Sequence, residues 1–370
     1  MIITVLIILF ILLLYIVLIS RYSFGWRSID SFSDTNFFPQ VSLIIAMRNE
    51  EDQIIRLLRN LQFLTYPKDK LEIILINDHS TDDTLDILGN SDIDNLQILD
   101  LPEDKIGKKD AISMGIDNAR GEIILTTDAD CSFDYNWVQI MVSSFVDNNI
   151  KMVAGPVCFI RQEGMLHHFQ SLDFLSLVGS GAGAIGINNP IFCNGANMAY
   201  RKEVFLQMND FSNDQVASGD DVFLLHSIKA RYLNSITFLK HKDAIVFTNS
   251  MQSIINLINQ RKRWAAKTSA YKDKSSIYVS FLVFITNLSF VILLLLSLSS
   301  LQFFKFFLLF YFAKCLVDYL LLYPVLNFFS RKDLIKWVFI FELIYSFYII
   351  LIVILSLINK FEWKERMHKR

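Results

Sequence analysis

The chain has 370 residues, enough for one large domain with added elements or for two domains. Its formal net charge of −2 argues against a nucleic-acid-binding protein, which would normally carry a basic surface. Hydrophobic residues make up 53% of the chain, high for a soluble protein, and they are concentrated near its two ends.

The first 20 residues predict a transmembrane anchor. Residues 2–19 carry no charge, and a helix of that length, rising about 1.5 Å per residue, crosses the ~30 Å hydrocarbon layer. No basic segment precedes this stretch and no small-residue cleavage site ends it, which favours a retained anchor over a signal peptide. Arg21 and Arg27 follow, so by the positive-inside rule the next segment, 21–275, is expected to be cytosolic. This predicts an integral protein of the cell inner or plasma membrane.

The middle of the chain alternates short β-like runs with helical patterns. We expect strands at 41–46, 71–76, 96–99 and 122–126, and helices at 53–61, 81–88 and 109–119. This alternation predicts an α/β fold with a mixed, mostly parallel sheet. Ligands bind beyond the carboxyl ends of the strands in such sheets, and three of these expected strands end in charged or amide side chains.

Two carboxylates, Asp128 and Asp130, directly follow the fourth expected strand. Separated by one residue, both can reach one hard divalent cation such as Mg²⁺ or Mn²⁺, which prefers oxygen ligands and is often shared with substrate phosphates. By itself the pattern also fits a polar turn, because Asp is common after strands.

Cysteine and glycine usage adds little specific chemistry. Cys131, Cys158, Cys193 and Cys315 show neither CxxC spacing nor partnering histidines, so we expect reduced, buried side chains rather than disulfides or a zinc site. The Gly-rich segment 179–190 lacks the pattern of a phosphate loop and is interpreted either as a flexible acceptor-side loop or as a close-packed segment.

Seven segments, in order, resemble the family 2 glycosyltransferases. They are VSLIIAMRNE at 41–50, IILINDHSTDDT at 73–84, GKKDAISMG at 107–115, GEIILTTDADC at 121–131, CNGANMAYRKEVF at 193–205, SGDDVFL at 218–224 and QRKRW at 260–264. Each is weak to moderate alone, but their order and spacing make the set specific. The resemblance implies a GT-A fold and transfer of a sugar from a nucleoside diphosphate donor, with inversion at the anomeric carbon.

The resemblance also implies a donor site. Asp78 looks like the carboxylate that accepts from the uracil ring, and Glu50 lines the same nucleoside pocket, so a UDP-sugar is the expected donor. Lys108 is similar to a lysine that contacts the diphosphate, although a solvated basic surface at Lys108 and its neighbour explains the sequence equally well. Ser113 replaces the usual Asn of that segment, which puts a second contact there in doubt.

The resemblance further implies a metal site and a catalytic base. Asp130 is the expected direct ligand of Mg²⁺ or Mn²⁺, with Asp128 supporting it and reaching the ribose or sugar. Inverting transfer needs a base to take the acceptor proton, and Asp221 matches the last Asp of the family's acidic motif. Asp220 stands where Glu is usual, so its role stays open. The adjacent carboxylates could instead cap the following helix.

The segment Gln260–Trp264 fits the QxxRW motif. Trp264 can stack on a pyranose face, Arg263 can pair with diphosphate oxygens, and Gln260 and Asn197 complete the expected acceptor site. An interfacial amphipathic helix explains the same segment, and both interpretations can hold.

Three apolar stretches near the C-terminus, at 277–298, 303–326 and 337–358, predict a transmembrane bundle over 276–359, followed by a basic tail at 360–370. The middle stretch carries Lys305, Lys314 and Asp318, of which the last two could pair on one helix face. Three full spans from a cytosolic domain would put the tail outside, whereas its basic charge favours the inside.

The expected function is therefore inverting transfer from a UDP-sugar to a lipid-linked, saccharide or other membrane-associated acceptor, in polysaccharide or glycolipid biosynthesis. The QxxRW motif also makes the chain similar to the processive cellulose, chitin and hyaluronan synthases. Those enzymes extrude a polymer through a channel built from their own spans, and three C-terminal spans are few for such a channel. A non-catalytic membrane scaffold is the other alternative, and the acidic residues kept at every expected position argue against it.

Overall fold

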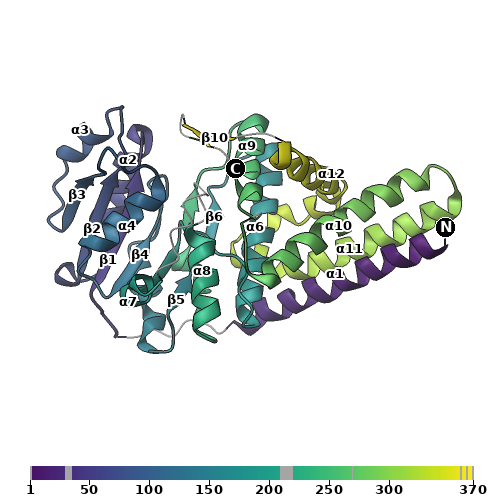
Figure 1. Ribbon diagram of the computed structural model, residues 1–370, viewed down its shortest axis with the longest axis horizontal. Coiled ribbons are helices and arrows are strands. Elements are labelled where there is room, and N and C mark those ends of the chain that lie inside the picture. Colours follow the sequence, from purple (N-terminus) through teal and green to yellow (C-terminus); the bar gives the residue numbers. More distant parts are fainter. Residues whose placement is uncertain are drawn as a thin grey trace. The chain divides into compact units, whose positions relative to one another are not determined.

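The computed structural model describes residues 2–29, 36–208, 220–268 and 270–358, together with two short strands at 361–363 and 366–368. The chain forms two compact units, each built from separate stretches (Figure 1). The unit that we call the sheet unit comprises Ile29–Ile160 and Phe192–Asn249. The helical unit comprises Met1–Ser28, Arg161–Ile191 and Ser250–Arg370.

The sheet unit is built on a seven-stranded sheet with the order β3-β2-β1-β4-β7-β5-β8. β1 to β4 run parallel, β7 is antiparallel to both β4 and β5, and β8 is parallel to β5. The predicted mixed, mostly parallel α/β sheet is thus confirmed. The strand bounds are Val41–Met47 (β1), Leu71–Asn77 (β2), Leu96–Asp100 (β3), Ile123–Thr126 (β4), Met152–Ala154 (β5), Met198–Arg201 (β7) and Ile236–Phe238 (β8), and a separate parallel pair joins Val157–Phe159 (β6) to Val246–Thr248 (β9).

Helices cover the central strands because these strands are apolar on both faces, as is usual for parallel sheets. One helix, α4, approaches β1 and β2 closely at Gly115, where a Cβ atom would lie 2.6 Å from Ile44 Cγ2. Glycine at this position therefore allows α4 to pack closely against β1 and β2. The helices of this unit are Glu51–Gln62 (α2), Thr84–Gly89 (α3), Lys108–Asn118 (α4), Trp137–Val142 (α5), Lys202–Leu206 (α7) and Asp220–Arg231 (α8), with 3₁₀ turns at Lys68–Lys70, Ser143–Val146 and Lys242–Ala244.

A partly buried carboxylate links the amino-terminal ends of the central strands. Glu72 on β2 accepts hydrogen bonds from the Ser42 hydroxyl and from the backbone N–H groups of Arg120 and Gly121, and it pairs with the Arg120 Nε at 2.9 Å. Burial opposes ionisation of Glu72, but these hydrogen bonds outweigh it and lower the pKa of the carboxyl. Ionised Glu72 therefore stabilises the junction of β1, β2 and the turn before β4.

The helical unit contains four helices that, among the residues described, are long and apolar enough to cross a membrane: α1, α10, α11 and α12. The charged middle stretch of the predicted bundle is one of them. The bounds are Ile2–Ser28 (α1), Met165–Gly186 (α6), Ile254–Thr268 (α9), Lys274–Ser297 (α10), Leu301–Phe328 (α11) and Trp337–Ile358 (α12), with a 3₁₀ turn at Lys332–Leu334 and an antiparallel pair of Phe361–Trp363 (β10) with Arg366–His368 (β11).

Glycines let α1 and α6 touch backbone to backbone. A Cβ atom on Gly183 would lie 2.3 Å from the Tyr22 carbonyl oxygen, and one on Gly25 would lie 2.0 Å from the Gly183 carbonyl oxygen. Most of the Gly-rich segment is helical and closely packed, which confirms the second of its two interpretations.

An ionic cluster joins three of the apolar helices. Lys314 on α11, only 1% exposed, lies 3.0 Å from Asp318 and also pairs with Glu342 on α12. The hydroxyl of Tyr15 on α1 donates to Asp318 over 2.7 Å. The predicted Lys314–Asp318 pair is confirmed, whereas helical spacing could not reveal partners on other helices.

Candidate active site

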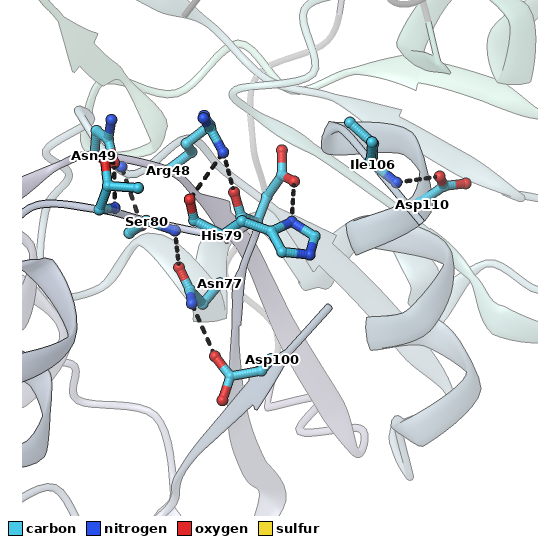
Figure 2. A network of polar contacts seen from close by, with 10 residues as sticks. Arg48, Asn49, Asn77, His79, Ser80, Asp100, Ile106 and Asp110 are labelled. Carbon is cyan, nitrogen blue, oxygen red and sulfur yellow. Dashed lines mark hydrogen bonds and ion pairs between the residues drawn. The ribbon is translucent and has the colours of Figure 1, made fainter. Parts of the chain in front are cut away.

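Hydrogen bonds connect the loop that follows β1 to the loop that follows β2 (Figure 2). The Arg48 guanidinium on the first loop donates to the carbonyl oxygens of Asp78 and His79 on the second, both at 2.8 Å. Asn49 and His79 both adopt left-handed backbone conformations, with φ of 50° and 57°. Such conformations are uncommon outside glycine and concentrate at functional sites, where surrounding contacts hold them.

Two of the predicted donor-site carboxylates lie at this edge. The sheet register pairs Met47 with Asn77, so the residues that follow both strands leave the sheet together. Asp78 is 4% exposed, donates its N–H to the Met47 carbonyl at 2.8 Å and lies 3.1 Å from His79 Nδ1. Glu50 precedes α2 and donates its N–H to the Thr84 hydroxyl at 2.8 Å. Both residues thus lie at the carboxyl ends of parallel strands, where ligands of such sheets bind.

The acidic turn after β4 has the donor set for a metal ion. Asp128, Asp130 and Cys131 each offer one ligand atom, and these atoms lie within 4.8 Å of one another. The Thr248 hydroxyl donates to Asp130 Oδ2 at 2.9 Å and orients that carboxylate. Burial, together with the charge of Asp130, raises the pKa of the Cys131 thiol. The two carboxylates are therefore the fitting ligands, and they suit Mg²⁺ or Mn²⁺.

A second group forms around Gly195. The Lys108 ammonium at the start of α4 pairs with Asp128. A Cβ atom on Gly195 would lie 3.6 Å from Lys108 Nζ and 3.3 Å from the Cβ atom of Asp221. The Gly195 N–H donates to Asp221 Oδ2 at 3.0 Å, and the Val222 N–H donates to Oδ1 at 2.8 Å. Three predicted site residues from distant segments are thus brought to one place.

From the sequence, Gly195 is expected to help shape the acceptor cleft together with Asn194 and Asn197, but no contact can be assigned to it. The structure shows that its N–H is bound to Asp221. Asp220 begins α8, and its side chain lies outside the described residues.

Asn197, the predicted acceptor-site amide, is fully buried, and its hydrogen bonds stabilise the fold. Trp137 Nε1 donates to its Oδ1 at 3.0 Å, and its Nδ2 donates to the carbonyl oxygens of Pro156 and Ala244 at 2.8 Å. Its side chain therefore braces the loop that carries Gly195 and presents no free amide to a ligand.

The residues Gln260, Arg263 and Trp264 belong to α9 of the helical unit, whereas the other predicted site residues belong to the sheet unit. Trp264 is half-buried, and the guanidinium carbon of Arg261 lies 4.1 Å from the centroid of its ring. Gln260 accepts a hydrogen bond from the same guanidinium at 3.0 Å.

A mixed α/β sheet with acidic side chains at the carboxyl ends of its parallel strands agrees with the expected GT-A fold. Residues 42–208 match the family model described as glycosyl transferase family 2.

The similar proteins carry corresponding names. The chain is 28% identical over 208 residues to "Glycosyltransferase AglE" of Haloferax volcanii, covering 55% of this chain and 66% of that protein. It is 26% identical over 234 residues to a "Poly-beta-1,6-N-acetyl-D-glucosamine synthase" of Staphylococcus aureus, covering 61% and 53%. The aligned stretch thus spans less than two thirds of each relative.

A solved structure supports the fold. The mannosyltransferase PcManGT from Pyrobaculum calidifontis, determined in complex with GDP-Man and Mn²⁺, matches with a TM-score of 0.60 and 18% identity, over 92% of this chain and 97% of that one.

Proposed function

We propose that this chain transfers a sugar, with inversion, from a nucleoside diphosphate donor to a lipid-linked or other membrane-associated acceptor at the cytosolic membrane face. The observation that carries the proposal is the gathering of Lys108, Asp128 and Asp221 around Gly195 in the sheet unit. A cation for the diphosphate and a carboxylate for the acceptor proton are what such a transfer requires at one place.

The diphosphate is assigned to Lys108 and to the acidic turn. Lys108 would bind diphosphate oxygens, exchanging part of its contact with Asp128 for the ligand. Asp130 and Asp128 would hold Mg²⁺ or Mn²⁺, which when bound neutralises charge on the leaving diphosphate. The Thr248 hydrogen bond supports this assignment because it holds Asp130 in one orientation.

The base of the donor is assigned to Asp78 and Glu50. A buried carboxylate can accept the imide N–H of uracil, so we expect UDP-sugars to be preferred. Guanine also offers a ring N–H, and PcManGT was solved with GDP-Man, so the donor panel must include both nucleotides.

Asp221 is assigned as general base. The N–H groups of Gly195 and Val222 fix the orientation of its carboxylate beside Lys108. We propose no separate step for Asp220.

The acceptor side is assigned to Trp264, Gln260 and Arg263 on α9. This helix belongs to the unit in which four of the described helices could span a membrane. Ile254 and Ile255 at its start are 63% and 72% exposed, which supports contact with lipid. We accordingly keep the anchor at 1–20, the cytosolic domain at 21–275, the bundle at 276–359 and the basic tail at 360–370 as the proposed topology.

A second candidate is a processive polysaccharide synthase, favoured by the name of the staphylococcal relative. A single transfer would yield a lipid carrying one added sugar, whereas a processive enzyme would yield long chains.

The experiment uses the full-length protein in native membranes with labelled UDP- and GDP-sugars, and resolves the products by lipid extraction and chain length. We expect transfer that EDTA abolishes and that Mg²⁺ or Mn²⁺ restores. Asp130→Ala should be inactive with either cation. Full activity in EDTA would overturn the metal assignment, and no transfer from any donor would favour the scaffold alternative.

A further inference from the structure

The QxxRW segment contains a buried ion pair at one of its variable positions. The Arg261 side chain is 6% exposed and that of Asp173 on α6 is 4% exposed. Arg261 Nε donates to Asp173 Oδ2 at 2.9 Å, and Nη2 lies 2.7 Å from the same oxygen. Burial alone would lower the pKa of the guanidinium, but Asp173 outweighs burial and raises it, so the pair is ionic.

A buried charge pair of this kind is costly unless its geometry is favourable and its remaining polar atoms are hydrogen-bonded. Desolvating both groups offsets most of their attraction, so such pairs contribute more to the definition of one arrangement than to stability. The arrangement defined here is that of α9 on α6, two helices of the same unit whose pairing residues are 88 positions apart.

Arg261, whose position the ion pair fixes, also contacts two residues of the motif. Its Nη1 donates to Gln260 Oε1 at 3.0 Å. Its guanidinium carbon lies 4.1 Å from the Trp264 ring centroid, within the range of a cation–π contact. The planar guanidinium can make these contacts and bind a carboxylate at once, which an ammonium group cannot.

We infer that Arg261, held by Asp173, is a positioning residue that fixes the orientation of the Gln260 and Trp264 side chains. This inference rests on the proposed acceptor role of α9. Because Arg261 covers one face of the Trp264 ring, a sugar cannot stack on that face, which restricts the orientations in which an acceptor can bind.

The test uses full-length protein in membranes, with Asp173→Asn and Arg261→Lys as test variants and Arg331→Lys as the matched control. Arg331 is also buried in the helical unit, where it contacts Asp333 and Ser171. Arg261→Lys keeps the charge beside Asp173, so it serves if Asp173→Asn fails to fold.

The first readout needs no enzyme activity. The fluorescence of Trp264 is isolated in each background by subtracting the matching Trp264→Phe protein, and its quenching by acrylamide is measured. We expect the quenching constant to rise about twofold in both test variants, because the covered ring face opens, and to stay unchanged in the control.

The second readout is kinetic. Both test variants should raise the acceptor KM or lower turnover on the order of tenfold, with the donor KM unchanged, because only acceptor placement is disturbed. Asp173→Glu should recover part of the loss. Quenching and kinetics equal to those of the control would overturn the inference. If the parent protein transfers no sugar at all, the proposed function fails, while the quenching comparison still decides the positioning role.

Discussion

Replacing Asp221 by Asn tests the assignment of the base most directly. The carboxylate accepts two backbone N–H bonds, from Gly195 at 3.0 Å and from Val222 at 2.8 Å. The Asn carbonyl oxygen can keep one of them, so the unfolding free energy should fall by only about 1–3 kcal/mol. An amide cannot take the acceptor proton, so turnover should fall on the order of 10²-fold or more, equivalent to roughly 2.7 kcal/mol or more in the barrier.

The assay measures initial rates of sugar transfer together with donor affinity by equilibrium binding. Donor affinity should be unchanged in Asp221→Asn, because the donor is assigned to other side chains. Asp147→Asn is the matched control, since Asp147 also accepts a backbone N–H, from Asn149 at 2.9 Å, in a loop outside the site. Undiminished turnover in Asp221→Asn would refute the assignment, as would an equal loss in both variants.

Three further predictions concern the fold. Glu72→Gln should lower the free energy of unfolding at neutral pH. Because the folded pKa of Glu72 lies below its ordinary 4.5, this difference in free energy from the parent protein should shrink as pH falls through the folded pKa. Chemical denaturation at several pH values measures it. Gly183→Ala should cost about 1–3 kcal/mol of stability by thermal unfolding in detergent, whereas Gly89→Ala, with open space around it, should be neutral. Cys131 should resist iodoacetamide at pH 8 until the chain is unfolded, because burial raises the pKa of its thiol. Labelling is measured by mass spectrometry, and rapid labelling of the native protein would contradict this prediction.

Local patterns were enough to predict the framework. β1, β2 and β4 are short apolar runs followed at once by polar residues, so both the parallel sheet and the position of Asp78, Asp128 and Asp130 at its carboxyl edge follow from the order of residues along the chain. Lys314 and Asp318 could be paired for the same reason, because four positions on a helix bring side chains together.

Contacts between distant segments could not be predicted in this way. The hydrogen bonds from Gly195 to Asp221 and from Thr248 to Asp130 depend on how loops fold in three dimensions, which periodicity does not encode. Asn197 illustrates the limit: its place in a conspicuous segment suggests a ligand contact, yet its burial commits its amide to Trp137 and two carbonyl groups.

The helical unit draws on the beginning, the middle and the end of the chain, and this affects how the protein is made. Tyr15 leaves the ribosome before its partner Asp318, which follows 303 positions later. α1 therefore lacks these final neighbours while the intervening residues are synthesised. A chain that stops before α11 would leave that helix without its ionic partner, so we expect prematurely terminated products to be recognised and degraded by cellular quality control.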